Sequence, residues 1–289
     1  MSINSFQDPI KFFNHVNEFL IQHEAENSIL FSNIEGIISK RYTGNNLMIS
    51  VEGNGKIVLV AIMTPPHNLV LSYTQTMRSI DHLLRFLVSK NIEIPGILAF
   101  KKGAKRFVKL WQKKKNISYK LVMNERVYKL ERVDERYLGF HDFRPIDLSY
   151  ESLVLKWIKL FIEEALPHEN SEINEELLKI TRKRIEEKCY FLLFDNNNPV
   201  SMVHKARKTP NGNLINQVFT PSDLRGRGYA TEAVAKISKH LLDEVNRYCF
   251  LFTDLSNPTS NKIYQDVGYN PIMDMDQYKF ILVQKEIEE

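Results

Sequence analysis

The chain has 289 residues, of which 43% are hydrophobic, enough to form the core of one large or two ordinary domains. It has no apolar run of about eighteen residues and no basic segment followed by an apolar one at its start. Its two cysteines, Cys189 and Cys249, are too few for a disulfide framework or a cysteine-rich metal site. We therefore expect a soluble, cytoplasmic protein with no membrane span and no metal.

The net charge of +4 is unevenly distributed. Residues 1–140 carry 20 Lys and Arg against 12 Asp and Glu, which gives +8. Residues 141–289 carry 19 against 23, which gives −4, and the two values sum to +4. Such asymmetry favours two domains.

The first regular sequence pattern in the first half of the chain predicts β-strands. The turn EGNGK at 52–56 joins two apolar runs as a hairpin. Residues 79–90 have apolar side chains at helical spacing and predict a helix. The expected strands are 47–51, 57–63 and 69–74, and the inward face of the helix is Ile80, Leu83, Leu84 and Leu87.

Much of the basic excess lies in KKGAKRFVKLWQKKK, residues 101–115. A nucleic-acid surface is one interpretation. The apolar residues Ala104, Phe107, Leu110 and Trp111 fall at helical spacing, however, so the lysines can equally be the solvated face of an amphipathic helix. A charge run alone is weak evidence, and we expect the solvated face and no nucleic-acid partner.

The second half shows a similar succession of strands and helices. An Asn-rich turn at 195–199 predicts a hairpin. The expected strands are 140–148, 189–194, 200–206 and 214–220, and the expected helices are 151–166, 172–187 and one that begins near Tyr229. The expected inward residues of 151–166 are Leu153, Trp157, Leu160 and Phe161.

The two halves resemble each other at an offset of 153 positions. Residues 109–112, KLWQ, align with residues 262–265, KIYQ, and the apolar run 97–100 aligns with 250–253. A strand, a helix and a similar tetrapeptide in the same order favour two copies of one fold. We expect domains at 1–135 and 138–289.

The sequence RGRG, Arg225 to Gly228, follows a predicted strand and precedes a predicted helix. The first amides of a helix lack partners in the chain and favour an anion. The glycines allow close approach and a tight turn, and the arginines add donors suited to phosphate oxygens. The loop is not a Walker A motif and lacks the third glycine of a dinucleotide fingerprint. It predicts a diphosphate site, and the alternative is a surface turn.

Residues 218–221 followed by RGRGYATEAV resemble the acetyl-CoA signature of the GNAT superfamily of N-acetyltransferases, with Arg225, Gly228 and Ala230 at the motif positions. A second family motif is matched by Asn257, Ser260, Ile263, Tyr264, Gly268 and Tyr269. The close resemblance covers about residues 138–289. It implies an α+β fold with two tandem acetyltransferase-like domains, each a mixed, mostly antiparallel sheet flanked by helices.

The resemblance also implies a reaction, the transfer of an acetyl group from acetyl-CoA to a primary amine in a ternary complex. Tyr264 matches the family's general acid, and a backbone N–H near Val218 would polarise the thioester carbonyl. The pantetheine arm would pair with the strand edge ending at Thr220. The implied cofactor-binding residues are Val218, Phe219, Thr220, Arg225, Gly226, Arg227, Gly228, Tyr229, Ala230, Thr231 and Asn257.

Several roles stay open at this point. Asn257 precedes Pro258, so it can cap a helix as well as bind the cofactor. The general base is either His204 or a water relay. A small cationic amine is the expected acceptor, drawn by the glutamates near the first interhelical loop. Those glutamates are Glu163, Glu164, Glu169 and Glu172. Cys249 adjoins an apolar strand, and a buried thiol is expected rather than an acyl-cysteine.

The first half departs from the family where the chemistry lies. At the 153 offset, residues 72–77 contain no glycine and no arginine, and Trp111 stands in place of Tyr264. This copy is expected to be structural or to complete the acceptor pocket. The alternative function is a non-catalytic acetyl-CoA sensor whose basic first half contacts a partner. The sequence does not indicate an oligomeric state.

Overall fold

The computed structural model describes residues 1–166, 171–244 and 247–282. The chain forms two compact units that do not follow one another end to end. The first unit is Met1–Arg126 together with the segment that begins at Met273, and the second is Val127–Ile272. Division at residues 132–140, as expected from the sequence, would instead leave the final strand with the second half. That strand forms part of the first unit.

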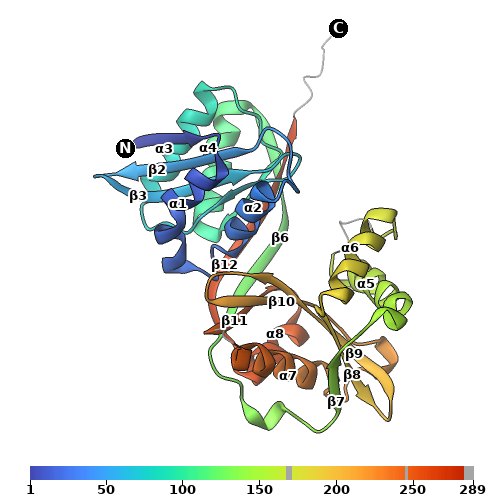
Figure 1. Cartoon of the computed structure of the whole chain (residues 1–289). Helices are drawn as coiled ribbons and strands as arrows, with labels where there is room; N and C mark the ends of the chain where they lie inside the picture. The colour runs from blue at the N-terminus through green and yellow to red at the C-terminus, as the bar shows by residue number, and fades with distance from the viewer. Residues whose placement is uncertain (167–170, 245–246, 283–289) are drawn as a thin grey trace. The chain divides into compact units, whose positions relative to one another are not determined.

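The two units contain the same order of elements (Figure 1). The first half of the chain has β1 (Ser2–Phe6), α1 (Pro9–Leu20), α2 (Ser28–Ile38), β2 (Leu47–Gly53), β3 (Lys56–Met63), β4 (Leu69–Leu71), α3 (Met77–Ser89), β5 (Gly96–Phe100), α4 (Lys101–Lys115) and β6 (Ile117–Leu130). The second half has β7 (Asp142–Pro145), α5 (Glu151–Ala165), α6 (Glu175–Glu186), β8 (Tyr190–Asp195), β9 (Asn198–Lys208), β10 (Gly212–Phe219), α7 (Tyr229–Glu244), β11 (Tyr248–Asp254), α8 (Pro258–Val267) and β12 (Asn270–Leu282). This repeated order is what two copies of one fold predict.

Each sheet is mixed and mostly antiparallel. The first unit has strand order β1-β2-β3-β4-β5-β12-β6, and the second has β6-β11-β10-β9-β8-β7. The parallel pairs are β4 with β5 and β10 with β11. In each copy, the strand after the last helix does not pair with the strand before that helix. β5 pairs with β12, and β11 neighbours β6.

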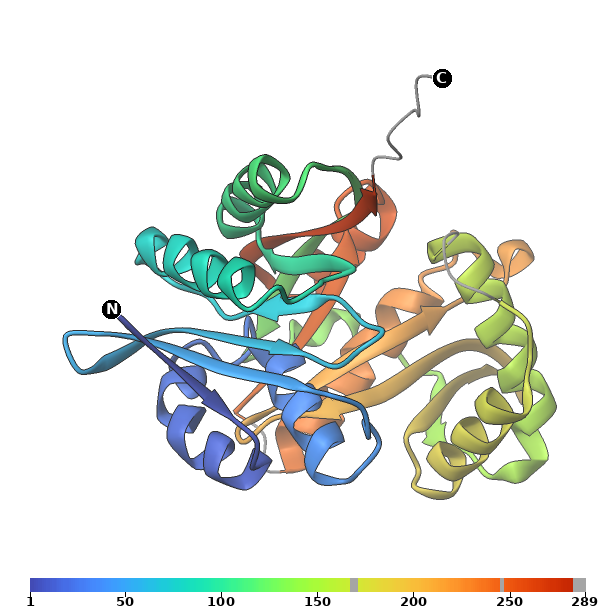
Figure 2. The same cartoon turned by 90° about the horizontal axis from the view of Figure 1, so that it is seen from above.

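Both sheets are covered by two helices on each face. In the first unit, α1 and α2 lie on one side of the strands, and α3 and α4 on the other (Figure 2). Alternating residues of β3 serve the two cores: Leu59 and Ala61 pack with α3 and α4, whereas Val60 and Ile62 pack with α1 and α2. In the second unit, α5 and α6 pack on one face, and α7 and α8 on the other.

The helix and strand assignments from the sequence agree with the structure at most sites. Ile80, Leu83, Leu84 and Leu87 of α3 are buried, as predicted. The inward face of α5 is different: the buried residues are Val154, Leu155, Trp157 and Ile158, and Leu153, Leu160 and Phe161 are only partly buried. The sequence pattern predicted the wrong buried face of α5, because apolar side chains occupy a wide arc of this helix. None of the described helices is long and apolar enough to cross a membrane.

Candidate active site

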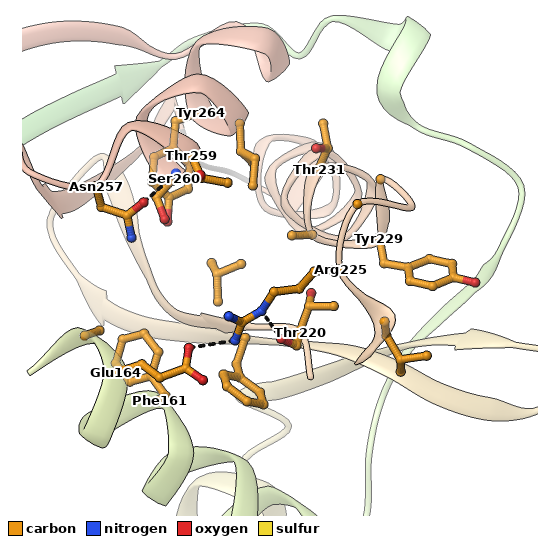
Figure 3. Close-up of a pocket in the computed structure, with 18 residues that line it drawn as sticks. Phe161, Glu164, Thr220, Arg225, Tyr229, Thr231, Asn257, Thr259, Ser260 and Tyr264 are labelled. Atoms are coloured by element: carbon orange, nitrogen blue, oxygen red, sulfur yellow. Dashed lines mark hydrogen bonds and ion pairs between the residues drawn. The ribbon is translucent and has the colours of Figure 1, made fainter. Parts of the chain in front are cut away.

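A pocket opens in the second unit where two parallel strands part. β10 and β11 are paired from Gly212 to Leu214, opposite Tyr248 to Phe250. These paired residues end at Leu214, whereas β10 continues to Phe219. A pocket of about 510 Å³ lies at this end of β10, between the loop before α7 and the start of α8. Figure 3 shows these elements around it. The parted strands thus supply an open strand edge beside a helix N-terminus.

Most of the residues expected to bind the cofactor line the pocket. Eleven of the twelve predicted site residues line it, and Arg227 is the exception. The lining residues are Phe161, Glu164, Ala165, Val218, Phe219, Thr220, Leu224, Arg225, Gly226, Gly228, Tyr229, Ala230, Thr231, Asn257, Thr259, Ser260, Ile263 and Tyr264. They come from β10, the glycine loop, α7, α8 and the end of α5.

The glycine loop leaves a row of backbone amides without partners. Gly226 and Gly228 have φ of +78° and +84°, a region that side chains disfavour, and no atom lies within 4 Å of a Cβ built on either. Among the described residues, no acceptor bonds the backbone N–H groups from Gly226 to Ala230. Unpaired amides at the start of the 16-residue helix α7 favour an anion. The loop therefore fits a phosphate group.

Arg225 is held at the edge of the pocket by two oxygen acceptors. Its Nε donates to the Thr220 carbonyl at 2.9 Å, and its guanidinium donates to Glu164 Oε2 at 2.6 Å, as Figure 3 shows. About half of each side chain in the Arg225–Glu164 pair is exposed. Exposed pairs of this kind contribute at most about 1 kcal/mol. An incoming phosphate can therefore compete with Glu164 for the guanidinium.

Arg227 does not line the pocket, and the Tyr229 ring points away from the pocket's centre. The Arg227 guanidinium approaches the Asp223 carbonyl at 3.5 Å. The Tyr229 ring turns outward in Figure 3, and its hydroxyl donates to Asp195 Oδ2 at 2.5 Å. The hydrogen bond to Asp195 raises the pKa of Tyr229. Tyr229 thus anchors the first turn of α7 to the end of β8, and only its remaining surface reaches the pocket.

β10 has a β-bulge directly beside the pocket. Asn216 lies opposite His204 and Phe219 opposite Met202, so Gln217 and Val218 together face the single residue Val203. Gln217 has φ of +47°, in the left-handed region. A bulge redirects a strand locally and leaves a residue outside the ladder. Here it redirects the backbone at Val218, which lines the pocket.

Tyr264 lies on α8 at the inner wall of the pocket. Its side chain is 8% exposed, and its ring contacts the rings of Tyr128 and Tyr269. Burial raises the pKa of Tyr264 to about 12. The phenol therefore keeps its proton at neutral pH, which is the state that a proton donor needs. The same residue also packs in the core.

Asn257 caps α8. Its Oδ1 accepts a hydrogen bond from the Ser260 N–H at 3.0 Å, and Pro258 occupies the first helical position. The structural role considered from the sequence is therefore present. Because Oδ1 is engaged, the amide nitrogen is the part of this side chain that remains for a ligand in the pocket.

The candidate base does not reach the pocket. His204 is 2% exposed, and it does not line the cavity. Burial, with the nearby positive charge of Arg184, lowers the pKa of His204 to about 3. The ring is stacked on Tyr190, and its Nδ1 lies 2.7 Å from Asn216 Oδ1. Of the two routes considered for removing the amine's proton, the water relay fits these positions better.

Cys249 is fully buried and lies outside the pocket, 3.7 Å from the Ser238 carbonyl. Burial raises the pKa of its thiol to about 12. A nucleophilic cysteine needs the opposite environment, one that favours the thiolate. The position of Cys249 agrees with a structural thiol and disfavours an acyl-cysteine.

The glutamates expected to attract a cationic amine are largely engaged with groups of the chain. Glu164 pairs with Arg225. Glu163 accepts from the Ser171 hydroxyl and lies 3.9 Å from Lys159. Glu172 also has an interaction partner, and Glu169 lies outside the described residues. Of the three that the structure describes, only Glu164 lines the pocket.

Some lining residues were not foreseen from the sequence. Leu224 and Thr259 belong to segments already singled out, so their positions follow from the motifs. Phe161 and Ala165, in contrast, come from the last turns of α5. The apolar end of that helix is only partly buried in the core, and this excess of apolar surface is the one signal that could have indicated a pocket wall.

The chain resembles known proteins in part of its sequence and in its fold. Residues 153–269 match the sequence model of the Acetyltransferase (GNAT) family. A search of curated protein sequences finds no match. A GNAT-family acetyltransferase from Colwellia psychrerythraea has 12% identity and a TM-score of 0.59, covering 97% of this chain and 100% of that one.

Two further solved structures cover almost all of both chains. A Drosophila protein has 9% identity and a TM-score of 0.64, covering 97% of this chain and 98% of that one. A GCN5-related N-acetyltransferase from Sphaerobacter thermophilus has 13% identity and a TM-score of 0.61, covering 97% and 96%. At these identities the likeness concerns the fold, and it confirms the predicted fold class of tandem domains. Residues 153–269 form a GNAT acetyltransferase domain, and the C-terminal half of the chain is GNAT-like.

Proposed function

We propose that the protein transfers an acetyl group from acetyl-CoA to a primary amine. The observation that carries the proposal is the composition of one pocket. It joins the free amides of the Gly226–Gly228 loop, the redirected backbone at Val218 and the protonated phenol of Tyr264. An anion site, an oxyanion donor and an acid are the groups that transfer from a diphosphate-bearing thioester requires.

The diphosphate of acetyl-CoA would be held by the amides from Gly226 to Ala230 and by the Arg225 guanidinium. Both glycines leave the space outside the loop open, which supports this fit. The amide-containing arm would lie along the edge of β10 at Val218–Thr220, where pairing with β11 has ended. The Asn257 amide nitrogen is a further donor at the same wall.

The transfer step uses few groups of the protein. The amine nitrogen forms a bond to the thioester carbonyl carbon, and the carbon–sulfur bond breaks. The Val218 N–H stabilises negative charge on the carbonyl oxygen. The Tyr264 hydroxyl gives its proton to the departing thiolate, and solvent returns a proton to the phenolate. The surplus proton of the amine leaves through water, because His204 is buried away from the pocket.

The acceptor is proposed to be a small amine. The pocket volume of about 510 Å³ lies within the range of about 300–1,000 Å³ typical of small-ligand sites, but the cofactor would fill part of it. The negative charge of the second half favours a cation over an anion. Glu163 and Glu164 already interact with other groups of the chain. The attraction of a cationic amine therefore comes from the net negative charge of the second half rather than from these two carboxylates.

Calorimetry with acetyl-CoA, followed by turnover with a panel of amines, tests the proposal. Binding and release of free CoA only in the presence of an amine are the expected results. A single-turnover experiment with labelled acetyl-CoA and no amine should leave no label on the protein, and Cys249→Ala should retain full activity. Binding without transfer to any amine or peptide would make the protein an acetyl-CoA sensor and contradict catalysis.

A further inference from the structure

The bulge at Gln217 and Val218 places an unfavourable backbone conformation beside the pocket. Gln217 has φ of +47°. A residue with a Cβ is disfavoured in this region relative to ordinary backbone angles, and bulges of this form usually place glycine here. A glutamine at this position therefore needs interactions that hold it there.

The side chains of the two residues at the start of the bulge are bonded to a stacked aromatic pair. The Tyr190 hydroxyl donates to Gln217 Oε1 at 2.8 Å. His204 Nδ1 lies 2.7 Å from Asn216 Oδ1. Tyr190 and His204 face each other across β8 and β9, with their ring centroids 4.5 Å apart. Three neighbouring strands thus converge on the bulge.

This aromatic pair is rigidly placed. Tyr190 is 1% exposed and belongs to the core formed with α5 and α6. The positive charge of Arg184 of α6 also lies near the Tyr190 hydroxyl. Groups packed in this way lose little further freedom when they form a hydrogen bond, so they can hold a neighbouring backbone in one conformation.

We propose that Tyr190 is a positioning residue for the acyl transfer: by bonding Gln217 it keeps the bulge in the conformation that aims the Val218 N–H at the thioester carbonyl. Tyr190 does not line the pocket and acts only through Gln217. The inference rests on the proposed function, because it requires acetyl-CoA to lie along β10. It adds to that function a hydrogen bond to the thioester carbonyl, which acetyl-CoA has and CoA lacks.

The test uses two measurements that need no knowledge of the acceptor. The first is the ratio of the dissociation constants of acetyl-CoA and CoA. The second is the infrared band of the thioester carbonyl in protein-bound acetyl-CoA labelled with carbon-13 at that carbon, because a hydrogen bond to the carbonyl lowers its stretching frequency. The four proteins are the wild type, Tyr190→Phe, Gln217→Gly and the double variant.

Tyr190→Phe keeps the ring that stacks on His204 and removes only the hydroxyl. We expect it to weaken acetyl-CoA binding about 2- to 10-fold, the range for one hydrogen bond, with CoA binding unchanged and the carbonyl band at a higher frequency. Glycine adopts positive φ freely. In the Gln217→Gly background, Tyr190→Phe should therefore have no effect on either measurement.

Tyr278→Phe is the matched control. It removes another tyrosine hydroxyl bonded to a side chain, that of Asp276, in the first unit, and should leave the ratio and the band unchanged. An unchanged band in Tyr190→Phe, or an equal effect of that substitution in the Gln217→Gly background, would overturn the inference. Failure of the wild type to bind either CoA or acetyl-CoA would instead refute the proposed function.

Discussion

The junctions of β4 with α3 and of β10 with α7 occupy equivalent places in the two copies, yet their backbones are satisfied differently. Before α3, the Tyr73 N–H donates to Asn27 Oδ1 and the Thr76 N–H donates to Thr74 Oγ1. Before α7, the amides from Gly226 to Ala230 have no acceptor within the described chain. At the first junction side chains of the protein accept from two of the amides, whereas at the second no side chain of the described residues does so.

The strands that lead to these junctions also differ, in length and in pairing. β4 has only three residues, all buried, and the hydroxyl of the following Ser72 accepts from the Val60 N–H. β10 has eight residues, continues beyond its pairing with β11, and in that continuation has a bulge in its pairing with β9. The two copies of the fold thus differ at this junction: side chains bond two amides in the first copy, and a glycine loop without such bonds stands in the second.

The largest effect is expected for the acid in the second copy. Tyr264→Phe should lower kcat about 10²–10⁴-fold, because the departing thiolate loses its proton donor, with little change in acetyl-CoA affinity. Steady-state turnover with an amine that the wild type acetylates measures this. With the pKa of Tyr264 at about 12, the wild-type kcat should show no loss from phenol ionisation between pH 7 and 10. Equal kcat values in the two proteins over that range would remove Tyr264 from the mechanism.

The equivalent residue of the first copy should matter for stability alone. Trp111 is 3% exposed and stacks on Phe107. Trp111→Ala should lower the free energy of unfolding by about 3–5 kcal/mol through the lost contacts and the cavity left behind. Denaturant unfolding measures this loss, and calorimetry of the folded variant should give an unchanged affinity for acetyl-CoA. A large loss of affinity would show that the first copy takes part in cofactor binding.

The glycine loop should be sensitive to a single methyl group. Gly228→Ala puts a Cβ where the phosphate is proposed to lie, and it should weaken acetyl-CoA binding on the order of 10- to 100-fold through lost charge-assisted hydrogen bonds. Gly55→Ala is the matched control, because Gly55 has φ of +72° and the same open surroundings in the first unit. Both variants should lose a similar amount of stability from the positive φ. Equal acetyl-CoA affinities in the two would contradict the placement of the phosphate.

A further expected effect is a pH dependence of stability from the aromatic pair behind the bulge. His204 has a pKa of about 3 in the folded protein, lowered by burial and by Arg184 of α6, against about 6.5 in an unfolded chain. Its neutral form therefore stabilises the fold fully above about pH 6.5, and this contribution falls by about 1.4 kcal/mol per pH unit towards pH 3. Urea unfolding between pH 7 and 4 should show a shallower loss for His204→Asn than for the wild type.

Local sequence accounts for a large part of this molecule. The helix start near Tyr229, the amphipathic face of α3 and the cap at Asn257 each depend on residues within a few positions of one another, so spacing and side-chain type are enough to predict them. The same holds for the glycine loop and for its suitability for an anion. The repeat at 153 positions also predicts the repeated order of elements.

Contacts between distant segments were beyond the reach of such patterns. The 14-residue strand β6 begins directly after α4, and β12 pairs with β5, about 180 positions earlier in the chain, rather than with a local partner. The backbone of β12 could form its hydrogen bonds with any apolar strand edge of suitable length. Its partner is therefore determined only by the packing of the whole sheet. The pairing of Glu164 with Arg225 and of Tyr190 with Gln217 likewise joins residues 61 and 27 positions apart. The chemical character of the loop therefore follows from its own residues, whereas the walls of the pocket and the geometry of the bulge depend on tertiary packing, because side-chain types do not specify which distant partner they meet.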